Sequence, residues 1–305
     1  TVDSIKRAVE DASRMAGVEV GSIYAGIAGG HIKGVNSQGV IAVSRADKQI
    51  TKEDVDRVID AAKAIALPLD REVIHVIAQE FVVDHQEGIT NPVGMYGLRL
   101  EGKVHIVTGA VTSAQNIIKS VEKAGYYVED IVLQPLASSE AVLTQDEKDL
   151  GVALVDIGGG TSDIAIFIDG SLRHTAVITM GGNMVTNDIA FGLRTPQAEA
   201  EVIKKKYGCA TSEGVGETEE IKVAGVGGRP DRIVLKMSLV QIIQPRMEEI
   251  FEMITNEIKS NGFEKRLAAG IVLTGGGAMV HGTVDLVEKI IQLPVRLGSP
   301  RGVSG

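Results

Sequence analysis

The segment at residues 154–167, LVDIGGGTSDIAIF, constrains the fold more than any other part of the chain. An apolar run ends at Asp156, three glycines turn the chain, and a second apolar run follows. This order predicts two strands joined by a tight turn. Successive glycines leave their backbone N–H groups bare, and such a nest of donors suits phosphate oxygens. The competing interpretation is a hairpin without a ligand, for which one glycine would be enough.

Two further glycine clusters follow along the chain. One comes directly after a predicted apolar strand at residues 271–273, and the other begins a predicted helix near residue 184. Glycines let a flat ligand or a phosphate approach the backbone, and helix N-termini attract anions. Taken singly, each cluster is explained about equally well as a tight turn. The three clusters comprise Gly158, Gly159, Gly160 with Thr161, then Gly181, Gly182 with Asn183, and then Gly275, Gly276 and Gly277.

An acidic side chain accompanies the first cluster. Asp156 ends the apolar run beside the glycine turn. Mg²⁺ prefers oxygen ligands and keeps part of its water shell. We therefore expect Asp156 to hold Mg²⁺ through water.

The order of these motifs resembles the second half of the fold shared by actin, Hsp70 chaperones and sugar kinases. The resemblance implies that the first cluster contacts phosphates and that the third, with Met279, contacts adenosine. It also implies that Glu201 and Lys204, which share a helix face at a spacing of three, approach the ribose and adenine. A solvated charged face is the alternative for that pair. Gln134 in the segment LQPLASSEAVL falls where relatives orient the attacking water, so Gln134 and Asp156 are the candidate catalytic residues.

Bulk properties narrow the class of protein. A length of 305 residues suggests about two domains. The net charge of −9 argues against nucleic acid as a partner. Cys209 is the single cysteine, so no internal disulfide forms, which fits a reducing compartment. The histidines lack metal-ligand spacing, and no arrangement for nucleophilic catalysis is visible.

Periodicity predicts the following elements. Helices are expected at residues 2–16, 113–123, 184–191, 196–208 and 283–291, from Thr51 as N-cap to about residue 67, and from Ser238 as N-cap to about residue 258. Strands are expected at residues 22–32, 40–44, 73–84, 130–134, 152–156, 163–168, 172–179, 233–237 and 271–273. Residues 98–100 and 103–108 are expected to form a hairpin around Glu101 and Gly102, and residues 145–149 to form a charged link.

Long stretches sharpen the resemblance to the FtsA family. They include HVIAQEFVVDHQEGITNPVGMYGLRLEGKVHIVTG (75–109), GSLRHTAVITMGGNMVTNDIAFGL (170–193) and AGVGGRPDR (224–232). The resemblance covers essentially the whole chain. It implies an α/β, actin-like ATPase (ribonuclease H-like) fold with two lobes and the FtsA-specific, SHS2-like subdomain 1C. The implied subdomains are 1A at 1–36 and 116–147, 1C at 37–115, 2A at 148–183 and 265–305, and 2B at 184–264.

The family resemblance also implies a function. FtsA-like proteins bind ATP with Mg²⁺, form filaments, anchor the FtsZ ring to the inner membrane and recruit later division proteins through 1C. Subdomain 2B would bind the acidic C-terminal peptide of FtsZ, with Arg229, Arg232 and Arg246 as candidate contacts. Ordinary surface arginines are the alternative. The expected location is the cytoplasmic face of the bacterial inner membrane at the division site, with at most slow ATP hydrolysis.

Two family features are expected to lie outside this sequence. These are the first phosphate motif, upstream of residue 1, and a C-terminal amphipathic helix that lies in the membrane interface. We therefore expect a piece of a longer chain that binds ATP weakly or not at all and does not bind membranes. An Hsp70-type chaperone, a sugar kinase and a pilus-assembly ATPase of FtsA-like shape are the alternatives. The GGRPDR and LRHT stretches favour the division protein.

Overall fold

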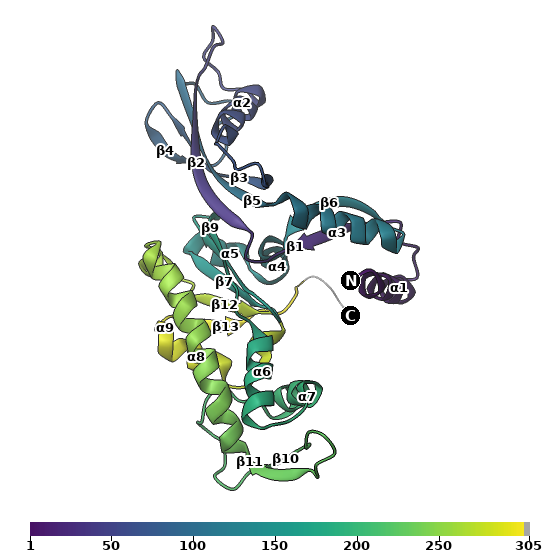
Figure 1. Ribbon diagram of the computed structural model, residues 1–305. Helices are drawn as coiled ribbons and strands as arrows, with labels where there is room; N and C mark the ends of the chain where they lie inside the picture. Colours follow the sequence, from purple (N-terminus) through teal and green to yellow (C-terminus); the bar gives the residue numbers. More distant parts are fainter. Residues whose placement is uncertain (302–305) are drawn as a thin grey trace. The chain divides into compact units, whose positions relative to one another are not determined.

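The computed structural model describes residues 1–301 and contains two compact units (Figure 1). The first unit comprises residues 1–137 and 171–175, and the second comprises residues 138–170 and the chain from residue 176 onward. Each unit has its own sheet and its own buried side chains. Within residues 1–301, no helix combines the length and the apolar character that a bilayer crossing requires.

The second unit is organised around a five-stranded sheet in the order β13-β12-β7-β8-β9. The strands are β7 (Val152–Ile157), β8 (Ser162–Ile168), β9 (Ser171–Ile178), β12 (Ile271–Thr274) and β13 (Val295–Leu297). β7 runs antiparallel to β8 and parallel to β12. All but one residue of β7 and all of β8 are buried, which explains why both read as continuous apolar runs. The register places Asp156 opposite both Asp163 and Thr274.

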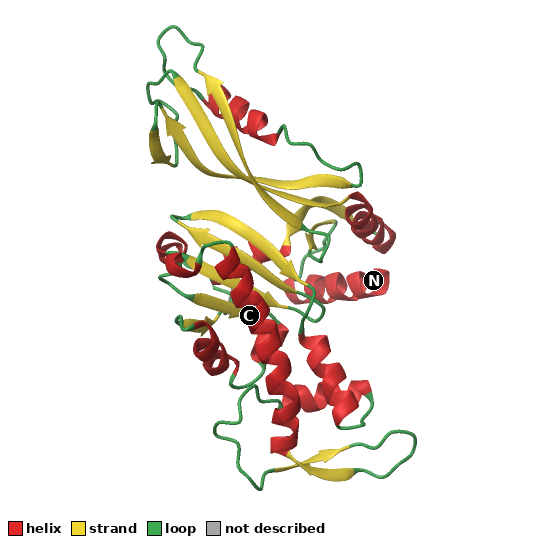
Figure 2. Cartoon of the chain, turned by 60° about the vertical axis from the view of Figure 1, so that its left-hand side comes forward, coloured by secondary structure: helices red, strands yellow, loops and turns green. Residues whose placement is uncertain are grey.

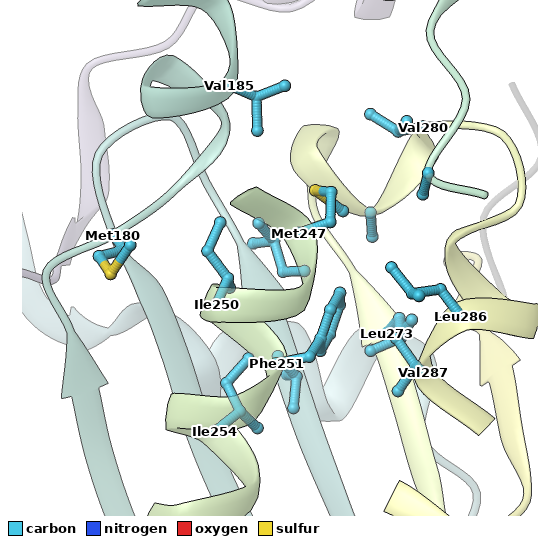
Figure 3. Packing of buried hydrophobic residues seen from close by; sticks show 14 of the residues in the cluster. Met180, Val185, Met247, Ile250, Phe251, Ile254, Leu273, Val280, Leu286 and Val287 are labelled. Atoms are coloured by element: carbon cyan, nitrogen blue, oxygen red, sulfur yellow. The ribbon is translucent and has the colours of Figure 1, made fainter. Parts of the chain in front are cut away.

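Helices accompany this sheet, and all of them except α5 contribute side chains to a large apolar core. They are α5 (Gln145–Leu150), α6 (Gly182–Gly192), α7 (Gln197–Tyr207), α8 (Lys236–Ser260) and α9 (Thr283–Ile291), with short 3₁₀ turns η1 (Glu264–Arg266) and η2 (Gly276–Met279). Figure 3 shows Ile250 and Phe251 of α8 in the cluster that also holds Leu273 of β12 and Val287 of α9. A separate ribbon of β10 (Glu220–Val223) and β11 (Arg232–Leu235) precedes α8.

The first unit contains a four-stranded antiparallel sheet in the order β2-β5-β3-β4 (Figure 2). Its strands are β2 (Lys33–Ala42), β3 (Arg71–Val83), β4 (Gln86–Ile89) and β5 (Arg99–Ala110). Helix α2 (Lys52–Lys63) packs on β2 and β5, and its Val58 joins Phe81 and Leu100 in a buried cluster. Gly39 permits this packing, because a Cβ there would lie 2.2 Å from the backbone oxygen of Val58.

A smaller parallel pair completes the first unit. It consists of β1 (Ser22–Ile27) and β6 (Tyr127–Leu133), with α1 (Val2–Ala16) and α3 (Val111–Ala124) packed against each other nearby. α1 has no buried residue, although its apolar stripe is clear in the sequence. Helix α4 (Gln134–Val142) begins in the first unit and ends in the second.

The predicted hairpin around Glu101 and Gly102 is wrong. β5 runs without a turn from Arg99 to Ala110, and both residues pair with β2 and β3 on either side. The glycine serves a different purpose, because a Cβ on Gly102 would lie 3.1 Å from Val58 of α2. It marks a close helix–sheet contact rather than a turn.

Four other sequence predictions also needed correction. The charged link is helix α5, because Thr144 and Glu147 form a capping box at its start. Ser238 does not cap α8, which already begins at Lys236, and Leu235 at its N-cap makes no side-chain hydrogen bond. The strand expected at 22–32 ends at Ile27, and the short strand at 40–44 is the end of β2, whose full length pairs with β5.

The prediction at Thr51 is confirmed. Its side chain accepts a hydrogen bond from the Asp54 N–H, and the Asp54 carboxylate accepts one from the Thr51 N–H. Helix α2 ends at Lys63, earlier than the proline signal suggested, since the chain leaves the helix at Ala64. Helices α1 and α9 have the predicted bounds.

Candidate functional site

A pocket of about 390 Å³ lies within the second unit, where the first glycine cluster, the start of α6, the end of α7 and η2 meet. Nine of the predicted nucleotide contacts line it, namely Gly158, Gly159, Gly182, Asn183, Glu201, Lys204, Gly276, Gly277 and Met279. Gly160, Thr161, Gly181 and Gly275 are adjacent to these residues in the chain but do not line it. Lys205, Lys206 and His281 also line the pocket, and sequence reasoning missed them.

The first glycine cluster forms the turn between β7 and β8. Its base is closed by a hydrogen bond of 2.9 Å from the Gly158 N–H to the Thr161 carbonyl. Gly159 and Gly160 are exposed, and within residues 1–301 no acceptor is found for their N–H groups or for that of Thr161. This turn therefore leaves three successive N–H groups without an acceptor among the described residues, which the predicted phosphate role requires.

The second cluster supports that turn from behind. The N–H groups of Gly182 and Asn183, in the first turn of α6, donate to the carbonyls of Gly158 and Gly159 at 2.9 and 2.8 Å. A Cβ on Gly181 would lie 2.7 Å from the Gly158 oxygen, so this approach requires glycine. The amides that we expected to attract an anion are thus used within the chain, and they hold the glycine turn of residues 158–160 in place.

Two carboxylates flank the turn. Asp156 accepts a hydrogen bond of 2.7 Å from the Ser138 hydroxyl. Asp163, its partner across β7 and β8, accepts one of 3.0 Å from Thr161. Its other oxygen, Oδ1, is buried and has no hydrogen-bond partner among residues 1–301. Burial, with a smaller effect from nearby Asp156, raises the pKa of Asp163 to about 6. Sequence reasoning missed Asp163, although an acid inside an apolar strand was a visible signal.

The third cluster packs against the end of β7. Gly275 has a φ of 83°, and a Cβ there would lie 2.5 Å from Asp156 Oδ1. A Cβ on Gly277 would lie 2.4 Å from the Ile157 side chain. These glycines therefore bring η2 close to the carboxylates. Met279 is 72% exposed at the pocket wall.

Glu201 and Lys204 of α7 do not form a solvated face. Lys204 is 8% exposed, and its ammonium lies 2.7 Å from the Glu201 carboxylate. Burial opposes ionisation of Glu201, but hydrogen bonds from Lys204 and Thr186 outweigh it and lower the pKa of Glu201. The pair is thus a largely buried ion pair in the pocket wall.

The remaining predicted residues lie elsewhere. Gln134 begins α4, where a Cβ on Gly26 would lie 3.0 Å from its side chain, and its catalytic role stays a prediction. Arg246 of α8 is paired with Asp188 at 2.6 Å and with Glu249, and these partners raise its pKa. Arg232 donates to the Leu193 carbonyl, and Arg229 is exposed in the loop between β10 and β11.

Comparison with protein families gives two matches. The model described as "Cell division protein FtsA" matches residues 153–305, and the model described as "SHS2 domain inserted in FTSA" matches residues 29–108. The second match contains β2, β3, β4 and nearly all of β5, the sheet of the first unit.

Curated relatives extend over the whole chain. The cell division protein FtsA of Pseudomonas aeruginosa is 50% identical over 305 residues, which is all of this chain and 73% of the relative. The FtsA of Escherichia coli strain K12 is 42% identical over 311 aligned residues, covering all of this chain and 74% of the relative. The FtsA of Bacillus subtilis is 41% identical and covers 98% of this chain and 68% of the relative.

Solved structures support the fold. A PilM–PilN type IV pilus biogenesis complex matches with a TM-score of 0.65 at 12% identity, covering 96% of this chain and 74% of that chain. MreB5 of Spiroplasma citri bound to ADP matches with a TM-score of 0.52 at 22% identity, covering 62% of this chain and 60% of that chain. A MamK double helical filament matches at 0.50 and 16% identity, with the same coverage. The predicted actin-like α/β fold with an SHS2 domain is confirmed, and the chain belongs to the FtsA family of cell division proteins.

Proposed function

We propose that the chain binds ATP in the pocket of the second unit, with the low affinity that the sequence analysis expects, and acts as an actin-like division protein. One observation carries the nucleotide proposal: the donor nest formed by Gly159, Gly160 and Thr161 lies beside two carboxylates. Phosphate oxygens would accept hydrogen bonds from these three N–H groups, while Gly276, Gly277 and Met279 would face the adenosine. The MreB5 structure with ADP supports this use of the fold.

Mg²⁺ fits the same place. Asp163 Oδ1 is a buried oxygen without a partner, and its carboxylate lies opposite Asp156 in the β7–β8 register. Mg²⁺ is usually held by one or two carboxylates together with substrate phosphates and water. Asp156 and Asp163 would hold it, and the cation would neutralise phosphate charge. Bound Mg²⁺ would favour the ionised form of Asp163, which burial disfavours.

The variant Asp156→Asn tests the nucleotide proposal. It keeps the side-chain size and the Ser138 contact but removes the charge that attracts the cation. We expect the ATP affinity in Mg²⁺, measured by isothermal titration calorimetry, to fall about tenfold, the effect of losing one charged interaction. When the metal is removed with a chelator, the ATP affinities of the variant and the parent chain should differ little.

The matched control is Asp285→Asn, which removes an exposed carboxylate from α9 of the same unit. It should bind Mg²⁺ and ATP as the parent chain does. Equal ATP affinities of parent and Asp156→Asn in Mg²⁺ would contradict the assignment.

We further propose the subdomain boundaries given by the resemblance: 1A at 1–36 and 116–147, 1C at 37–115, 2A at 148–183 and 265–305, and 2B at 184–264. Subdomain 2B would bind the acidic C-terminal peptide of FtsZ. Arg229 is the candidate with the fewest bonds within the chain, because Arg246 is already paired with two carboxylates and Arg232 donates to the Leu193 carbonyl. Exposed Val226 and Ile233 nearby would supply apolar contacts for the peptide.

Later division proteins would bind through subdomain 1C. A groove of about 450 Å³ in the first unit, lined by residues of 1C and of 1A, has apolar residues such as Ile74 and Ile118 and a rim of carboxylates. Its acidic residues are Glu72, Glu122, Glu129 and Asp130, and none of the described lining residues is Lys or Arg. Such a groove suits a basic segment. The MamK filament supports the proposal that the chain self-associates. Its proposed place of action is the cytoplasmic face of the inner membrane at the division site.

A further inference from the structure

We propose that Ser138 of α4 is a positioning residue, which holds the Asp156 carboxylate in the orientation that Mg²⁺ binding requires. The inference rests on the nucleotide and metal site proposed above. It adds to that site a residue that lies outside the glycine clusters and outside the acidic pair. The role of Ser138 would be carried by one hydrogen bond.

The two oxygens of Asp156 have different surroundings. Oδ2 accepts a hydrogen bond of 2.7 Å from the Ser138 hydroxyl. Oδ1 faces Gly275, where a Cβ would come within 2.5 Å of it, so glycine keeps the space beside this oxygen open. Ser138 is the one hydrogen-bond donor found for the Asp156 side chain among residues 1–301. It therefore fixes which oxygen is occupied and which oxygen is left for a cation.

The hydroxyl of Ser138 is used outside its own helix. A serine hydroxyl has a single proton to donate. Inside a helix that proton often goes to the carbonyl four residues earlier, as it does from Ser120 of α3 to Asn116 at 2.7 Å. Ser138 instead donates to Asp156, which lies 18 positions further along the chain. The contact thus serves the carboxylate rather than the helix.

The orientation of the carboxylate matters because Mg²⁺ requires nearly ideal octahedral coordination. Carboxylates that hold a metal are usually fixed by hydrogen bonds of their own, and losing such a bond weakens metal binding. The second acid has the same arrangement, since Asp163 has one oxygen bonded to the Thr161 hydroxyl and the other without a hydrogen-bond partner among the described residues. Each acid of the pair is therefore anchored by one hydroxyl.

The test compares Ser138→Ala, which removes the hydroxyl, with Ser138→Thr, which keeps it. Ser139→Ala is the matched control, because Ser139 is 0% exposed in the same helix but lies about 100° further around its axis. ATP affinity is measured by calorimetry in Mg²⁺ and again with the metal removed by a chelator, with ATP titrated into the millimolar range. The readout is the ratio of the two affinities, since a variant that only weakens the fold lowers both alike.

We expect Ser138→Ala to lower the affinity in Mg²⁺ about fivefold, the effect of one hydrogen bond, and to leave the affinity in chelator unchanged. Ser138→Thr and Ser139→Ala should keep the ratio of the parent chain. In an Asp156→Asn background, Ser138→Ala should cause no further loss, because the orienting bond would act on a side chain without charge. Equal ratios for Ser138→Ala and Ser139→Ala, or losses that add in the double variant, would overturn the proposal.

A second measurement does not depend on nucleotide. In crystal structures of the parent chain and of Ser138→Ala, the Asp156 side chain should occupy one rotamer in the parent and turn away or occupy several in the variant. An unchanged Asp156 would overturn the positioning role whether or not ATP binds. A parent chain that binds no ATP, or binds it equally in Mg²⁺ and in chelator, would refute the proposed site itself and with it the purpose assigned to Ser138.

Discussion

At the scale of single residues, burial decides which side chains carry charge. His105 of β5 is 1% exposed; its Nδ1 lies 2.7 Å from Asn36 Oδ1 and its Nε2 lies 2.9 Å from Thr175 Oγ1. Asn36 Oδ1 can only accept, so the neutral ring donates from Nδ1 and accepts the Thr175 hydroxyl at Nε2. A second proton on the ring would reverse the Thr175 bond, because Nε2 would then donate to the hydroxyl oxygen. Burial, with a smaller contribution from His174, lowers the pKa of His105 to about 4.

This pKa predicts acid sensitivity of the first unit. The ordinary value of 6.5 applies to the unfolded chain, which binds the proton more readily than the folded chain between that pH and about 4. The contribution of this group to the free energy of unfolding is therefore fully present above pH 6.5. It falls by about 3 kcal/mol as the pH drops to 4. His105→Gln should flatten this dependence in urea denaturation followed across that range.

The control is His85→Asn, at an exposed histidine of the same unit with a φ of 77°, a conformation that Asn tolerates. Its pH dependence should match that of the parent chain. If His105→Gln retained the full acid sensitivity of the parent, another group would be responsible.

At the scale of elements, glycines determine how closely helices approach strands. Gly39 faces α2, where a Cβ would lie 2.2 Å from the Val58 oxygen and 2.6 Å from the Ala62 nitrogen. Both atoms belong to the helix backbone, so the helix itself would have to move. The Ser37 hydroxyl, which donates to the Ala62 carbonyl at 2.8 Å, fixes α2 at the same end.

We predict that Gly39→Ala destabilises the first unit by about 2–3 kcal/mol, the cost of overpacking a site that cannot relax easily. The measurement is the midpoint of urea denaturation. Gly21→Ala is the control, because a Cβ there meets no atom within 4 Å and Gly21 needs no positive φ. Comparable midpoints for both variants would show that α2 does not depend on this contact.

At the scale of the whole molecule, membership of the FtsA family leads to a partner prediction. Fluorescence anisotropy with a labelled FtsZ C-terminal peptide should show binding that Arg229→Glu weakens about tenfold, since it replaces an attractive charge with a repulsive one. Arg246→Glu is a poorer choice, because it would place a third carboxylate against Asp188 and Glu249.

Lys265→Glu is the matched control, with the same change in net charge at an exposed position of η1. It should bind the peptide as the parent chain does. Equal weakening by both variants would indicate non-specific attraction, and no binding by the folded parent chain would contradict the FtsZ proposal.

The sequence by itself determined the features whose causes are local. Three successive glycines after an apolar run are enough to predict the tight turn of residues 158–160, and the pairing of Thr51 with Asp54 is enough to predict the start of α2. Such signals depend on residues within a few positions of each other. The long stretches also identified the family, which the relatives confirm.

Only the tertiary structure decided the features that depend on distant neighbours. In the sequence Gly102 resembles a turn residue, but in the structure it lies against α2. Asp163 becomes a metal-ligand candidate only because β8 places it opposite Asp156. Lys204 resembles a surface lysine until α6 surrounds its ammonium with oxygens. Burial and cross-strand register arise when segments far apart in the chain pack together, and these contacts set the charge and the role of each residue.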